Sequence, residues 1–106
     1  AFNSTCLGKW SIVLNCTSHK DWATKENCIL INPSGTMPVA DGMFFNQGNP
    51  FNQGTFYTWS EDEAISAMEE AEKKVGQINT EGVKLGDNMT YSKTVDSILS
   101  LIFKDK

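Results

Sequence analysis

Two short apolar runs near the start of the chain constrain its fold more than any other feature. Ile12–Leu14 and Ile29–Ile31 each contain three apolar residues, mostly β-branched, and each run is followed by an Asn. Non-alternating runs of this kind are typical of strands that are buried on both faces of a parallel sheet. Fourteen residues separate the two runs, and a parallel connection needs about a dozen or more. We therefore predict an α/β fold in which these runs form adjacent parallel strands of a small sheet flanked by helices.

The carboxyl ends of the two predicted strands are the place where we expect a binding site. In open parallel sheets, ligands bind in the crevice outside the carboxyl ends of the strands. The residues that leave the first strand there are Asn15, Cys16, Thr17, Ser18 and His19, and those that leave the second are Asn32, Pro33, Ser34 and Gly35. Function is therefore expected at this edge of the sheet.

The length and charge of the chain argue against several classes of protein. A chain of 106 residues forms at most one domain. Its net charge is −4 and its nine basic residues are scattered, whereas nucleic-acid-binding proteins usually carry a basic patch. Its apolar runs are too short to span a membrane, and its first residues lack the basic start and apolar core of a signal peptide. We expect a cytoplasmic protein that binds no nucleic acid.

The cysteines give no metal-binding pattern. Cys6, Cys16 and Cys28 are an odd number at unrelated spacings, and a structural zinc site needs four Cys or His ligands in a tighter arrangement. We predict reduced thiols, no metal and no cofactor. The single His19 follows Cys16 by three residues. It is either an ordinary polar turn residue or half of a Cys–His pair, which would need spatial contact and an orienting group.

Two helices are predicted in the second half of the chain, at 60–76 and 90–106. For the first, Ser60 followed by Glu63 is a capping box, and Gly76 is a stop signal. Its apolar face, which we expect to be buried against the sheet, consists of Ile65, Met68, Ala71 and Val75. The second helix, also expected to pack on the sheet, has a stripe made of Val95, Ile98, Leu99 and Ile102. Residues 78–89 between them are expected to form a loop, with a helical turn at 81–85 as an alternative.

Residues 33–59 form a long segment without a clear period. It contains six of the eleven aromatic residues, which are Phe44, Phe45, Phe51, Phe56, Tyr57 and Trp59. It also repeats the sequence Phe-Asn-Gln-Gly at 45–48 and 51–54. Because disordered segments are poor in aromatics, we predict an ordered aromatic loop with two glycine turns, each pinned by a buried Phe. Two roles stay open for this loop, a surface lid without a ligand and a surface for sugar or base recognition.

The order of these segments resembles the end of the nucleotide-sugar-binding domain of a GT-B-type glycosyltransferase. In that family a helix end and a glycine precede a strand, and a turn with a carboxylate, a second strand with a proline, and two helices follow. The segments of this chain that carry the resemblance are residues 6–14, Asp21, 27–33, 60–75 and 91–102. The resemblance covers most of the chain and rests on order and spacing, because each motif is weakly specific.

The resemblance implies a truncated, Rossmann-like donor domain, a single partial α/β domain over 1–106. It would bind a nucleotide-sugar without being catalytic alone, since the acceptor domain and the first strands of the donor domain are missing; catalytic residues are not assigned. The predicted ligand-binding residues are Asn3, Ser4, Thr17, Ser18 and His19. Asn3 stands five residues before Gly8, where the family has a donor-binding glutamate, so this chain lacks that charge.

The alternative is a non-enzymatic binding or assembly module that uses the aromatic loop with its Phe-Asn-Gln-Gly repeat as its contact surface. A two-stranded sheet is rarely stable alone, and unpaired strand edges recruit other chains. We therefore expect either a homo-oligomer, with the sheet edge or the aromatic loop at the interface, or a missing upstream domain as the partner.

Overall fold

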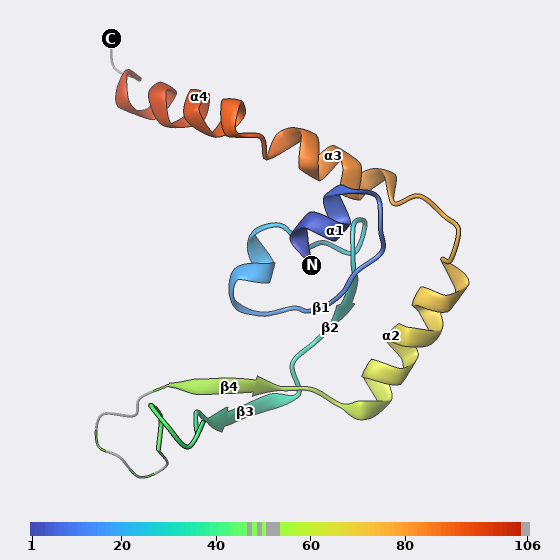
Figure 1. Ribbon diagram of the computed structural model, residues 1–106, viewed down its shortest axis with the longest axis vertical. Helices are drawn as coiled ribbons and strands as arrows, with labels where there is room; N and C mark the ends of the chain where they lie inside the picture. The colour runs from blue at the N-terminus through green and yellow to red at the C-terminus, as the bar shows by residue number, and fades with distance from the viewer. Residues whose placement is uncertain (47, 49, 51–53, 105–106) are drawn as a thin grey trace.

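The first sheet contains the two predicted strands in the predicted arrangement. The structure, a computed structural model, describes residues 1–46, 48, 50 and 54–104. In it, β1 (Ile12–Leu14) and β2 (Ile29–Ile31) pair in parallel, with Val13 opposite Leu30. The short 3-10 helix η1 (Thr17–Asp21) lies in the connection between them (Figure 1). The prediction of adjacent parallel strands, and the mixed α/β character of the fold, are confirmed.

The core around this sheet is small. Val13 and Cys28 are buried together with Ala23, which lies just after η1, and the half-buried Trp22 and Leu30 pack against them. The side chains at the centre are therefore short ones. The helix α2 (Glu61–Lys73) covers the sheet and contacts both β2 and β1.

Of the two predicted end signals of α2, the structure confirms the one at its C-terminus. Ser60 is the N-cap residue, but its side chain makes no capping hydrogen bond, so the predicted capping box is wrong. The helix ends at Lys73, and Gly76 follows with φ +82°. That left-handed conformation is one which glycine adopts without a steric penalty. The glycine stop is confirmed.

The buried face of α2 differs from the prediction. Ala67 is buried, while Ile65, Met68 and Val75 are 53, 63 and 80% exposed. The residues that face inward are alanines at helical spacing, with Ala67 flanked by the half-buried Ala64 and Ala71. Short side chains allow a helix to lie close to a sheet, and the larger apolar residues point elsewhere.

Residues 78–89, expected to be a loop, contain the helix α3 (Thr80–Asn88), which packs against α1 (Phe2–Cys6). A Cβ atom added at Gly82 would collide with the carbonyl oxygen of Thr5, and one at Gly86 would lie 2.9 Å from Cβ of Cys6. Gly82 and Gly86, whose low helix propensity favours a loop, are therefore what allows α3 to approach α1. Close packing outweighs low helix propensity here.

Asn79, the N-cap residue of α3, connects α3 to the segments that precede both strands. Its side chain is fully buried. Nδ2 donates to the carbonyl oxygens of Lys9 (3.0 Å) and Asn27 (2.7 Å), and Oδ1 accepts from the backbone N–H of Gly82 (3.0 Å). The backbone N–H of Asn79 also donates to the carbonyl oxygen of Gly8 at 2.9 Å. One side chain thus joins parts of the chain that are up to 70 residues apart.

The segment predicted as an aromatic loop contains a β-hairpin. Strands β3 (Gly35–Pro38) and β4 (Thr55–Thr58) pair antiparallel. Phe45 and Phe56 are 43 and 47% exposed, so the predicted burial of aromatics is wrong for the described residues. Four-residue strands with exposed side chains leave no periodic signal in the sequence. Phe51 and parts of both Phe-Asn-Gln-Gly repeats lie outside the described residues.

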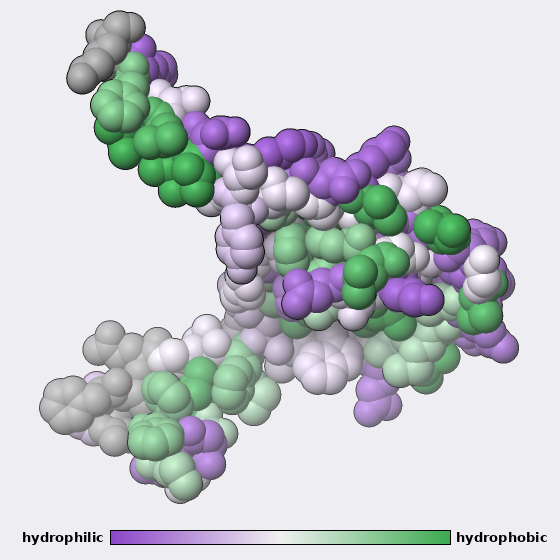
Figure 2. Space-filling view, turned by 45° about the horizontal axis from the view of Figure 1, so that its top comes forward, coloured by the Kyte–Doolittle hydropathy of each residue, from purple (hydrophilic) through white to green (hydrophobic). Residues whose placement is uncertain are grey.

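The last helix, α4 (Tyr91–Ile102), begins as predicted but does not pack on the sheet. Thr90 is its N-cap residue and accepts a hydrogen bond from the backbone N–H of Lys93 at 3.2 Å. No residue of α4 is buried. Figure 1 shows it extending away from the other elements, and Figure 2 shows its apolar side chains gathered along one side. The predicted packing of this helix is therefore wrong.

Replacing Asn79 is expected to destabilise the whole fold. In Asn79→Ala, the carbonyl groups of Lys9 and Asn27 lose their donor and α3 loses its cap, so we expect the free energy of unfolding to fall by about 3 kcal/mol. Urea denaturation followed by circular dichroism measures this. Asn88→Ala, at the exposed end of the same helix, is the matched control and should change stability by less than about 0.5 kcal/mol. Similar losses for both variants would contradict the role given to Asn79.

Gly82→Ala tests the close approach of α3 to α1 through the sign of its effect. An exposed helical glycine replaced by alanine gains about 1 kcal/mol. Here the added methyl group meets the backbone of Thr5, so we expect a loss of about 1–3 kcal/mol from overpacking. The same urea experiment measures whether the free energy of unfolding falls or rises. A stabilised variant would show that the two helices do not touch at this glycine.

Candidate functional site

The carboxyl ends of β1 and β2 carry two asparagines side by side. Asn15 Nδ2 donates to Oδ1 of Asn32 at 3.3 Å, and the backbone N–H of Asn15 donates to the carbonyl oxygen of Ile31 at 2.7 Å. The parallel register is the cause of this arrangement, because it brings equivalent strand exits to one edge. These two side chains therefore present neutral hydrogen-bonding groups at the edge.

His19 is held at this edge by its ring. Nδ1 lies 2.9 Å from the carbonyl oxygen of Leu14. A carbonyl oxygen only accepts, so Nδ1 carries a proton and donates it to this bond. The ring also packs edge-on against Trp22, with centroids 5.8 Å apart, and Trp22 packs edge-on against Phe2 at 5.3 Å. The hydrogen bond to Leu14 and the ring contact with Trp22 thus fix the position of the His19 ring.

Thr17 and Ser18 lie at the start of η1 with exposed side chains. Thr17 has φ +49°, the left-handed conformation, and is the one described residue other than glycine with positive φ. This conformation is uncommon for a β-branched residue. Backbone conformations of this kind cluster at functional sites.

Asn3 and Ser4 belong to a different surface. Both are exposed on α1. Asn3 lines a shallow depression of about 420 Å³ between α1 and α3, together with Phe2, Cys6, Leu7 and Gly86, and no residue of η1 lines it. The structure therefore brings Thr17, Ser18 and His19 together at the strand exit and places Asn3 and Ser4 apart from them. The link between the two groups is the ring contact of Phe2 with Trp22.

The cysteines form neither a disulfide nor a metal-binding cluster among the described residues. All three are free thiols, and the described residues contain no group of three His, Cys, Asp or Glu side chains that could hold a metal ion. Burial raises the pKa of the Cys28 thiol, against a smaller lowering by its contact with Thr5. The described contacts of the His19 ring are with Leu14 and Trp22, and no described contact gives it a cysteine partner. The Cys–His alternative therefore has no structural support.

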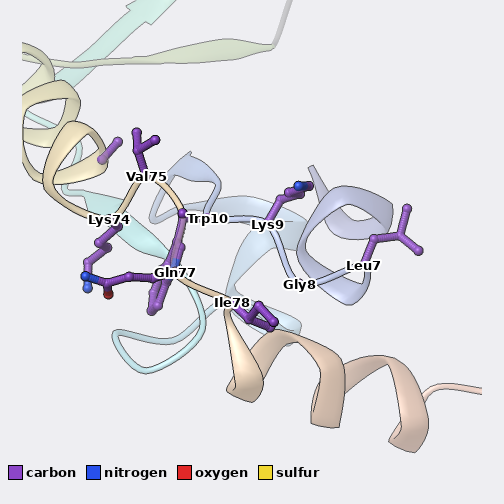
Figure 3. Close-up of a pocket in the computed structure, with 10 residues that line it drawn as sticks. Leu7, Gly8, Lys9, Trp10, Lys74, Val75, Gln77 and Ile78 are labelled. Atoms are coloured by element: carbon purple, nitrogen blue, oxygen red, sulfur yellow. The ribbon is translucent and has the colours of Figure 1, made fainter.

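A second cavity lies at the opposite end of β1, and sequence reasoning missed it. It measures about 370 Å³ and is lined by residues 7–10 and 74–78 together with Ala71. Nζ of Lys74 lies 4.0 Å from the centre of the Trp10 ring, and the buried Nε1 of Trp10 has no hydrogen-bond partner among the described residues. Figure 3 shows Lys74 and Gln77 beside this ring. The two lining segments are too far apart in the sequence for a local pattern to reveal the cavity.

The hairpin carries a third surface, made of Met43, Phe44 and Phe45, which are 73, 78 and 43% exposed. Oδ1 of Asp41 accepts a hydrogen bond of 2.8 Å from each of their backbone N–H groups. The hydrogen bonds from Phe45 and Met43 are the main cause of a pKa for Asp41 below the usual 3.8. One carboxylate therefore fixes the turn that presents these three apolar side chains.

Comparison of the chain with protein-family models, with curated proteins and with solved structures finds no match. Among the helices of the described residues, none combines the length and the hydropathy needed to cross a bilayer. The assignment of a function therefore depends on the geometry of these surfaces.

The turn held by Asp41 is expected to respond to acid. Because its pKa is lowered in the folded chain, the carboxylate stabilises the turn above its unfolded pKa, and this contribution is lost as the pH falls through the folded value. We expect the amide chemical shifts of Met43, Phe44 and Phe45 to follow one acid transition with its midpoint below pH 3.8. Asp41→Asn, which keeps an acceptor oxygen without a titratable proton, should abolish the transition. A transition with its midpoint at or above pH 3.8 would contradict the bonding described.

Proposed function

We propose that this chain is a nucleotide-sugar-binding unit similar to the end of a GT-B donor domain, and that the ligand binds at the carboxyl edge of β1 and β2. The observation that carries the proposal is the parallel pairing of these strands, with Asn15 and Asn32 in hydrogen-bonding contact where the strands end. Ligands of open parallel sheets bind at this place. The order of α1, Gly8, β1, η1, β2 and α2 along the chain agrees with the proposed resemblance.

The chemistry of the edge suits a sugar nucleotide in two ways. The carboxamides of Asn15 and Asn32 and the hydroxyls of Thr17 and Ser18 both donate and accept hydrogen bonds, as sugar hydroxyls require. His19, with its ring anchored through Nδ1, presents Nε2 as the second hydrogen-bonding position. Lys20 follows in η1 as an exposed cation, the kind of group that binds diphosphate.

The proposal covers binding and assigns no catalytic step. A GT-B site lies between two domains, and the edge described here forms one wall of such a site. We therefore expect weak binding by this chain, in the millimolar range, with selectivity for the sugar nucleotide over its separate parts.

Titration of the ¹⁵N-labelled protein with UDP-glucose and GDP-mannose at millimolar concentration tests the proposal. We expect saturable amide shifts at Asn15, Thr17, Ser18 and Asn32. UDP and glucose added separately should give smaller shifts at the same residues. Shifts confined to the cavity beside Trp10, or no shifts at all, would contradict it.

The double variant Thr17→Ala/Ser18→Ala removes two hydroxyl groups from the edge. Since each neutral hydrogen bond contributes about 0.5–1.5 kcal/mol, the loss of two such bonds is expected to weaken binding roughly 5- to 150-fold. Ser92→Ala/Ser100→Ala removes two exposed hydroxyls from α4 and is the matched control, with no change expected. Equal affinities for the two double variants would show that η1 does not contact the ligand.

The hairpin favours a second candidate function, a non-enzymatic assembly module. Among the described residues from 33 to 60, Asp41 is the one charged side chain, and Phe44, Phe56, Tyr57 and Trp59 are exposed. Contiguous exposed apolar side chains mark interaction surfaces. Light scattering at micromolar concentration tests this function. We expect Phe44→Ser to lower the average mass and Thr36→Ser, on the same hairpin, to leave it unchanged, and equal masses for wild type and Phe44→Ser would remove the hairpin from any interface.

A further inference from the structure

The helix α4 has an apolar stripe with the spacing of a helix–helix seam. Tyr91, Val95, Ile98 and Ile102 follow one another at intervals of four, three and four residues, which is the a and d pattern of paired helices. Leu99 widens the stripe on one side. All five are exposed, by 94, 52, 50, 64 and 45% in the order in which they are named here.

A helix of this length does not hold its shape alone. Isolated helices shorter than about 12–15 residues are marginal in water, and packing of the apolar face supplies most of their stability in proteins. The twelve residues of α4 include no buried one, and α4 is not part of any of the more extensive element contacts of the described residues. Among the described residues, the apolar stripe of α4 is therefore left open to a partner.

We infer that α4 is a self-association surface, and that its stripe packs antiparallel against the stripe of α4 from a second copy of the chain. With Ile98 near the two-fold axis, Val95 of one copy lies opposite Ile102 of the other. A two-fold interface is self-complementary by construction, and this stripe contains no charged residue that would repel its own copy. The charged and small polar residues lie off the stripe, and they are Ser92, Lys93, Asp96, Ser97, Ser100 and Lys104.

The exposed area of the stripe, taken in full, reaches the lower bound for a specific dimer. Fully exposed aromatic side chains carry about 150–250 Å² each and aliphatic ones somewhat less. The exposed fractions of the five stripe residues then correspond to roughly 500 Å² per copy, or about 1,000 Å² in total, which is the lower bound for a specific interface. The hairpin extends from the same side of the molecule as α4 (Figures 1 and 2), so its apolar side chains can add to the buried area.

Sedimentation equilibrium of the full chain over a micromolar concentration range tests the inference. We expect the wild type to sediment as a dimer that dissociates on dilution. Ile98→Glu places a charge at the centre of the stripe and should give a monomer, whereas Ser100→Glu, on the opposite face of the same helix, should remain a dimer. Circular dichroism of both variants controls for loss of the remaining helices.

A second variant tests the position of the two-fold axis independently of stability. Ile98→Cys should form an intermolecular disulfide with its own copy under mild oxidation, because residue 98 meets its equivalent. Wild type and Ser100→Cys, with the same three native thiols, should not. A monomeric wild type throughout the range, an Ile98→Glu variant that remains a dimer, or equal crosslinking of the two cysteine variants would each overturn the inference.

Discussion

The hydrogen bonds of Asn79 are the interaction on which the rest of the structure depends. Its carboxamide uses both amide hydrogens and its oxygen on three different backbone segments, those of Lys9, Asn27 and Gly82. Lys9 precedes β1 and Asn27 precedes β2, so the same side chain fixes the entry to both strands. An unpaired group at such a buried position costs about 1–3 kcal/mol. The loss of one hydrogen bond of Asn79 is therefore expected to weaken the contacts between all three segments.

Asn79 contributes a large share of the stabilising contacts because the apolar core is small. Three of the buried apolar residues around the sheet, Val13, Ala23 and Cys28, are small. The largest fully buried side chains among the described residues are those of Asn79 and Thr5. The Thr5 hydroxyl lies 2.9 Å from both the carbonyl oxygen of Ala1 and Oγ of Ser11. Specific polar contacts, together with the glycine-mediated approach of α3 to α1, define the position of the strands. The carboxyl edge with Asn15 and Asn32 is a consequence of that position.

The sequence predicted the elements that a local pattern defines and failed where distant segments meet. The parallel pair β1–β2 and the starts of α2 and α4 follow from apolar runs and N-cap residues. The helix α3 was missed because Gly82 and Gly86 lower helix propensity. Their packing against Thr5 and Cys6 joins residues far apart in the sequence, so no local pattern indicates it. The hairpin was missed because β3 and β4 are short and lie sixteen residues apart. Thr17, Ser18 and His19 directly follow β1 in the sequence and lie at its exit, whereas Asn3, on α1, lies on a separate surface.

Native-state hydrogen exchange of the monomeric Ile98→Glu variant tests the central claim most directly. If Asn79 joins α3 and the two strands into one cooperative unit, the hydrogen-bonded amides of Gly82, Ile29 and Asn15 exchange through the same global opening, with equal free energies. The amides of α4, which no described element covers, exchange at a much lower free energy. Exchange of the Gly82 amide as fast as that of α4, with the strands still protected, would show that Asn79 does not hold the structure together.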